Sequence, residues 1–313
     1  MIEEIKKSLE EIAKNHKIVL VDGCITRPFR GGDLNWEFYD KKDLFALNSE
    51  QKEEVRDNVE HLDFLTEFIN SNPNIATIEE VDSELKRNLA ILGEQYRFHN
   101  TKMKKRINKG YKRYGSDKEE IKELLDSLYY FVDSLSDRVI RPDNGTKEIY
   151  NALFDSMVLF DKNLNLRRKS KERLPRKKER SKEDTYADIK LVATSFYKSL
   201  TESTSVAIIS DDFDIGRLML FSYILLTSEE LKIPKESIFR NIPSHKPKMY
   251  SMLRNPSLPG YNLHTDLDEK TINGGFGRGT KEIKSIVENR LLEADKILQE
   301  NGIKRIIYPI AKY

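Results

Sequence analysis

Residues 206–214, VAIISDDFD, decide the fold. The run from Val206 to Ile209 is apolar without interruption, which is typical of a strand buried on both faces of a sheet. Acidic residues follow at once, at positions 211, 212 and 214. Ligands of open α/β folds bind at the carboxyl edge of the sheet. Because clustered carboxylates repel one another, this edge is expected to bind something cationic.

A second apolar run ends in the same way. Residues 17–23, KIVLVDG, predict a buried strand that closes on Asp22. An amphipathic helix is expected before it, over residues 2–15. If the two strands are parallel neighbours, Asp22 and the acids after Ile209 lie at one edge of the sheet. The fold class predicted is therefore α/β, with a parallel sheet flanked by helices.

The remaining elements are placed by periodicity and by turn residues. Thr77 is expected to cap the helix that follows a short strand, and residues 24–50 read as a loop over the sheet edge. Residues 274–280 are Gly-rich but lack the ending of a phosphate-binding P-loop. Further helices are predicted over residues 50–70, 78–92, 118–136, 183–200, 215–232 and 281–300, together with a short helix that ends at about residue 160. Strands are predicted over residues 74–77, 237–242 and 305–310.

Charge is distributed unevenly along the chain. Of 54 basic residues, seven lie in residues 102–113 and ten in 167–182, whereas these segments hold only two of the 52 acids. The rest of the chain therefore carries 37 basic against 50 acidic residues. Such basic arms on an acidic body favour a polyanionic partner such as RNA or DNA, although a solvated basic surface has the same composition.

Several classes of protein fit the composition poorly. No apolar stretch approaches the ~20 residues of a membrane span, and the first residues lack the apolar core of a signal peptide. The single cysteine, Cys24, excludes an internal disulfide and a cysteine-based zinc site. Five scattered histidines without His-x-x-x-His spacing argue against a zinc enzyme. We expect a cytoplasmic protein with no membrane partner.

Four acids, in their order and context, resemble those of the PIN-domain nucleases. Asp22 ends the first strand, in IVLVD, and Glu84 precedes Leu85 on a helix. Asp188 opens a helix that carries Ala-Thr soon after, at 193–194. The fourth acid lies in SDDFD, at 210–214, where Asp211 replaces the Asn that is usual in the family. The ligand at this strand end is therefore open between Asp211, Asp212 and Asp214.

The resemblance covers residues 17–90 and 183–242. It implies a discontinuous PIN-like core, 1–92 with 183–242, a mostly helical basic insertion at 93–182, and a C-terminal extension at 243–313. The activity it implies is hydrolysis of RNA phosphodiester bonds by a metal-dependent endoribonuclease. The cofactor would be Mg²⁺ or Mn²⁺, because hard divalent cations prefer carboxylate oxygens.

Under this interpretation, each acid has a role. Asp22 and Asp212 would be primary metal ligands, Glu84 and Asp188 would complete the shell or hold metal-bound water, and Asp214 is a further candidate. Ser210 would bond to a carboxylate or to a phosphate. The RNA backbone would be bound by basic residues of the two arms: Lys104, Lys105, Arg106, Arg167, Arg168, Arg176, Lys177 and Lys178.

Other interpretations stay open. A structure-specific DNA nuclease would have the same metal site, and a non-catalytic PIN-like module would bind RNA without cleaving it. A haloacid-dehalogenase-like phosphatase fits less well, because Asp22-Gly23-Cys24 lacks the second Asp that this family needs. Each of these interpretations is compatible with a homodimer of the chain.

Overall fold

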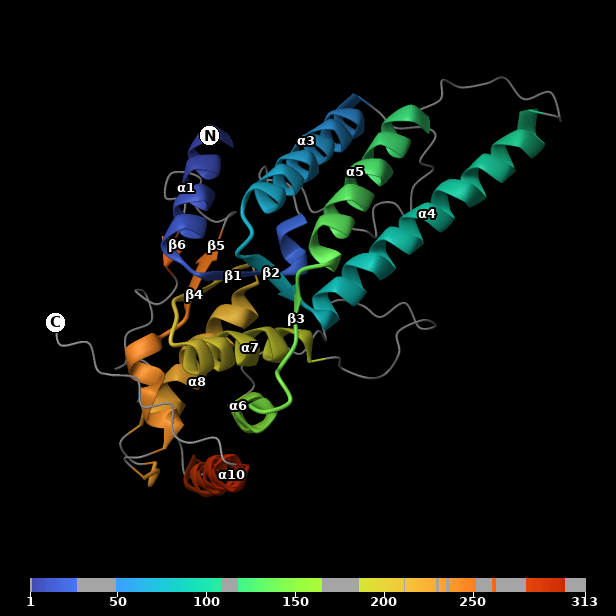
Figure 1. Ribbon diagram of the computed structural model, residues 1–313. Helices are drawn as coiled ribbons and strands as arrows, with labels where there is room; N and C mark the ends of the chain where they lie inside the picture. Colours follow the sequence, from blue (N-terminus) through green and yellow to red (C-terminus); the bar gives the residue numbers. More distant parts are fainter. Residues whose placement is uncertain are drawn as a thin grey trace. The chain divides into compact units, whose positions relative to one another are not determined.

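The structure is a computed structural model, and its chain divides into two compact units (Figure 1). One unit comprises residues 1–22 and 140–313, and the other comprises residues 23–139. The structure describes residues 2–26, 49–107, 118–164, 186–210, 212–228, 231–234, 237–251, 261–262 and 280–301.

The first unit is an α/β structure built on a parallel sheet. The elements described in it are α1 (Ile2–Asn15), β1 (Ile18–Val21), α6 (Lys147–Leu164), α7 (Ala187–Glu202), β4 (Val206–Ile209), α8 (Phe213–Thr227), η2 (Ile238–His245), β5 (Lys248–Ser251), β6 (Tyr261–Asn262) and α10 (Thr280–Glu300).

Strand β4 lies between β1 and β5 and is parallel to both. Its register with β1 runs from the pair Ile18–Val206 to the pair Val21–Ile209. All four residues of β4 are buried, as expected for an apolar run inside a sheet that is covered on both faces. Strand β6 is antiparallel to β5. The prediction that the two apolar strands are parallel neighbours is therefore confirmed.

Helices pack around this sheet through regular apolar stripes. Helix α7 contacts β4, α6 and α8. Helix α10 lies along α6 (Figure 1), and its buried residues recur at helical spacing. These buried residues of α10 are Val287, Leu291, Ala294 and Leu298. Part of the C-terminal segment thus belongs to the first unit.

The second unit is mainly helical. The elements described in it are η1 (Gly23–Thr26), α3 (Ser49–Ser71), β2 (Ile75–Ile78), α4 (Glu79–Ile107) and α5 (Lys118–Ser136), and β3 (Val139–Ile140) lies at its boundary.

Within the second unit, helix α5 packs against both α3 and α4 (Figure 1). The Arg138 guanidinium donates to the carbonyls of Ile69 and Asn72, at 2.7 and 2.8 Å. Both carbonyls also accept a backbone N–H, from Asn72 and from Ile75, so Arg138 adds a second bond at the end of α3. The Ser136 hydroxyl donates to Asp82 at 3.0 Å, which ties the end of α5 to the start of α4.

Two local predictions are wrong. Thr77 does not cap a helix, because it lies within β2, where its N–H donates to the carbonyl of Arg138 at 3.1 Å. The helix expected over 78–92 begins at Glu79 and continues to Ile107, so its expected end is also wrong.

Residues 237–242 are not a strand; they lie largely in the 3₁₀ helix η2. Ser237 begins this helix by accepting the N–H of Phe239 at 3.2 Å. The Arg240 side chain donates back to the carbonyls of Leu231 and Ile233, and it stabilises a compact turn in place of an extended segment. The strand expected at 305–310 and most of the loop expected at 24–50 lie outside the described residues.

Candidate functional site

The carboxyl ends of β1 and β4 form the candidate site. Asp22 follows β1 and Ser210 follows β4, directly after the paired residues Val21 and Ile209. The N–H of Asp22 donates to the carbonyl of Ile209 at 3.2 Å, so the ladder of the two strands extends to the acid itself. The parallel pairing places both strand ends at one edge of the sheet, as the sequence predicts.

Ser210 links two of the acids. Its hydroxyl donates to the Asp22 carboxylate at 2.8 Å and accepts the backbone N–H of Asp212 at 3.0 Å. Its own N–H donates to the carbonyl of Tyr250, on β5, at 3.0 Å. A buried hydroxyl with one donor and one acceptor bond has little freedom to rotate. Ser210 therefore holds the Asp22 carboxylate in a defined orientation relative to the turn at Asp212.

Asp212 and Asp214 lie where helix α8 begins. Asp212 is the N-cap of α8, and its carboxylate accepts the N–H of Asp214 at 2.8 Å. The N-terminus of a helix presents partial positive charge, which stabilises carboxylates at this position. Asp22 and Asp212 are half-buried, so neither is sealed from a ligand, whereas the Oδ1 atom of Asp214 is buried.

Asp188 lies in the first turn of α7, the helix that leads into β4. Three residues link α7 to β4 and the two elements are in contact, so the helix runs back along the strand. Asp188 is about 21 Å from the end of α7 at 1.5 Å per residue. Ser210 lies about 13 Å beyond the start of β4 at 3.3 Å per residue. These lengths are compatible with a position of Asp188 near the carboxyl edge, which stays a prediction.

Glu84 belongs to the other unit, 23–139, and lies exposed on α4. The acid that α4 buries is instead Asp82, which accepts bonds from Ser136 and from Lys86, the latter at 2.8 Å. Sequence reasoning missed the burial of Asp82, because its partner Ser136 is 54 positions away. The structure brings Asp22, Ser210, Asp212 and Asp214 together, and it leaves the role of Glu84 a prediction.

The expected RNA-binding residues lie partly in α4 and partly outside the described residues. Residues 104–106 lie in the last turns of α4, whereas Arg167, Arg168, Arg176, Lys177 and Lys178 fall outside the described residues, as does Asp211.

Within the described ranges, no group of three or more His, Cys, Asp or Glu side chains is arranged to hold a metal ion. The donors that meet at the edge are nevertheless of the right kind, because Asp22 and Asp212 offer carboxylate oxygens. Mg²⁺ commonly uses one or two protein carboxylates and keeps several water ligands. The chemistry of this donor set therefore fits a hard divalent cation.

Comparisons of the chain with protein-family models, with curated proteins and with solved structures found no match. Among the helices in the described part of the chain, none is both long enough and apolar enough to cross a membrane.

Proposed function

We propose that this chain is a metal-dependent nuclease of PIN-like fold that hydrolyses phosphodiester bonds in RNA. One observation carries the proposal: the Ser210 hydroxyl joins Asp22 to the turn at Asp212, at the carboxyl ends of two parallel neighbouring strands. An open α/β sheet binds its ligand at such an edge. The sequence resemblance to PIN nucleases and the two basic segments give independent support.

In this proposal, Asp22 and Asp212 would hold Mg²⁺ or Mn²⁺, with Asp188 and Asp214 as further candidate ligands, and Glu84 keeps only the role that the sequence resemblance implies. The bound cation supplies a Lewis acid for the phosphoryl oxygens and lowers the pKa of a bound water. Ser210 orients the Asp22 carboxylate, and the start of α8 favours negative charge at Asp212. The basic residues of the two arms contribute to binding of the RNA backbone.

The test of this proposal compares substrates and metals with the full-length chain. We expect cleavage of a single-stranded RNA oligonucleotide in the presence of Mn²⁺ or Mg²⁺ and none in EDTA. A DNA oligonucleotide of the same sequence separates the two nuclease activities, because cleavage of DNA alone would identify a DNA nuclease. RNA binding without cleavage in either metal would identify a non-catalytic module, and cleavage that persists in EDTA would contradict the metal site.

A further prediction concerns the arm at residues 167–182. Replacing five of its basic residues by Glu should weaken RNA binding and flatten the dependence of affinity on salt. For single-stranded nucleic acid, the slope of log K against log salt changes by about 0.7 per phosphate contact, so five lost contacts reduce it by about 3 to 4. Binding is measured by fluorescence anisotropy at several salt concentrations. The five substituted residues are Arg167, Arg168, Arg176, Lys177 and Lys178.

The matched control changes the net charge equally at positions outside this arm. It replaces five exposed lysines by Glu, and it should leave most of the salt slope in place. If both variants lower the slope equally, the effect reflects overall charge and the arm has no specific contact with RNA. The control lysines are Lys7, Lys14, Lys147, Lys162 and Lys296.

A further inference from the structure

Four aromatic side chains form a continuous row between α6 and α7, which we call the aromatic ladder. It consists of Tyr186, Phe154, Tyr150 and Tyr197. The Tyr186 ring meets the Phe154 ring edge to face, with centroids 6.1 Å apart. Phe154 stacks on Tyr150 at 6.2 Å, and Tyr150 meets Tyr197 edge to face at 6.0 Å. These are favourable geometries for aromatic pairs.

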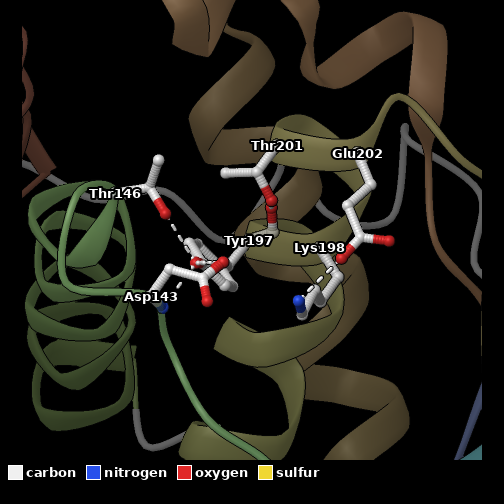
Figure 2. A network of polar contacts seen from close by, with 6 residues as sticks. All are labelled: Asp143, Thr146, Tyr197, Lys198, Thr201 and Glu202. Atoms are coloured by element: carbon white, nitrogen blue, oxygen red, sulfur yellow. Dashed lines mark hydrogen bonds and ion pairs between the residues drawn. The ribbon is translucent and has the colours of Figure 1, made fainter. Parts of the chain in front are cut away.

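One end of the aromatic ladder is fixed at Tyr197. Figure 2 shows the Tyr197 hydroxyl facing Asp143 and Thr146. It accepts the backbone N–H of Asp143 at 3.0 Å and lies 2.6 Å from the hydroxyl oxygen of Thr146. The Tyr197 side chain is fully buried. This end is therefore anchored by packing and by hydrogen bonds to the turn that precedes α6.

The other end, Tyr186, is the N-cap of α7 and has an unusual backbone. Its φ is 54° and its ψ is 28°, in the left-handed region that residues with large side chains seldom adopt. Its carbonyl accepts the N–H of Lys190 at 2.8 Å, which is the first hydrogen bond of the helix. The contact of the Tyr186 ring with Phe154 joins this residue at the start of α7 to helix α6.

Asp188 follows two residues later, in the first turn that this hydrogen bond closes. We propose that Tyr186 is a positioning residue: its contact with Phe154 sets the first turn of α7 and thereby places Asp188 at the carboxyl edge of β4. This inference rests on the proposed function. It adds a contact outside the acids, between Tyr186 and Phe154, that would keep a proposed metal ligand in position.

The test measures Mn²⁺ affinity by electron paramagnetic resonance of the full-length chain, and it needs no catalytic activity. Tyr186→Gly removes the ring but can adopt the left-handed backbone without strain, whereas Tyr186→Phe keeps the ring. We expect the Phe variant to bind Mn²⁺ like the unsubstituted chain. The Gly variant should bind about tenfold more weakly, as is usual when the support of a metal ligand is removed.

A structural control separates positioning from stability. Phe196→Leu alters a fully buried ring on the same helix, two turns from Asp188, and should lower the melting temperature without changing Mn²⁺ affinity. If Tyr186→Gly does not fold, Phe154→Leu breaks the same contact from α6 while keeping an apolar side chain. Equal loss of Mn²⁺ affinity in Phe196→Leu and in the variants of the aromatic ladder would overturn the inference.

The two proposals fail in different ways. If Asp22→Asn and Asp212→Asn leave Mn²⁺ affinity unchanged, the proposed metal site is wrong and the positioning role falls with it. If those variants lose affinity but Tyr186→Gly and Phe154→Leu retain it in full, only the inference about Tyr186 is overturned.

Discussion

Asp22→Asn and Asp212→Asn are each expected to lower the rate of Mn²⁺-dependent RNA cleavage by at least about 100-fold. Residues that merely support a metal ligand typically contribute 10- to 100-fold, so removal of a primary ligand should cost more. The measurement is a single-turnover cleavage assay with saturating protein. Both substitutions replace a charged oxygen with an amide of the same shape, which removes a ligand for a hard cation without opening a cavity.

The fold should survive both substitutions, for reasons visible in the structure. The amide oxygen of Asn can still accept the Ser210 hydroxyl at position 22. At position 212, Asn is as good an N-cap as Asp, so the start of α8 keeps its bond from the N–H of residue 214. Circular dichroism and melting temperature should therefore match those of the unsubstituted chain.

The matched control is Asp63→Asn, which removes an exposed carboxylate from the surface of α3. It should leave cleavage unchanged. The assignment of the site would be contradicted if Asp22→Asn and Asp212→Asn cleaved as fast as this control. A loss in only one of the two would leave the sheet edge as the site and exclude the other acid as a ligand.

The strand pair that positions this edge can be predicted from sequence because its signal is local. A short continuous apolar run indicates a buried element, and its β-branched residues favour a strand, so that a following acid lies at the strand end. The structure confirms this for β1 and β4. The serine between Asp22 and Asp212 was also a candidate in the sequence, and its bond to Asp22 is present.

Features that depend on distant partners were not predictable. Strand β5 has only four residues, follows Pro247 and carries no clear alternation, so its pairing with β4 decides its conformation. The left-handed backbone of Tyr186 likewise has no signal in the local sequence, because Tyr has no preference for it, and the ring that Tyr186 contacts, Phe154, is 32 positions earlier. In both cases tertiary contact overrides what the local sequence favours.

Acidification is expected to destabilise the fold through two buried histidines, one in each unit. Burial lowers the pKa of His61 to about 4, and its hydrogen bond with the carbonyl of Ile25 opposes this only in part. Burial also lowers the pKa of His16 to about 4, with a further contribution from the charge of Lys248. His16 bonds the Tyr250 hydroxyl at 2.9 Å, so its protonation state bears on the strand next to β4.

Stability falls on acidification because the unfolded state binds protons more readily than the folded state does. Well above pH 6.5 both histidines are neutral in the folded and in the unfolded chain, so they do not lower the free energy of unfolding. Between pH 6.5 and pH 4 the unfolded chain takes up protons that the folded chain does not, so the free energy of unfolding falls with pH. For His61 alone the loss is about 2 kcal/mol at pH 5 and about 3 kcal/mol at pH 4.

Urea denaturation followed by circular dichroism at pH 7 and pH 5 measures this loss, and His61→Gln isolates the contribution of one histidine. The Gln amide can donate to the carbonyl of Ile25 as His61 does, but it does not titrate. Between pH 7 and pH 5 the variant should therefore lose about 2 kcal/mol less stability than the unsubstituted chain. An equal loss in both proteins would mean that His61 is protonated without penalty in the fold, and the acid sensitivity would then have to come from His16 or from the carboxylates.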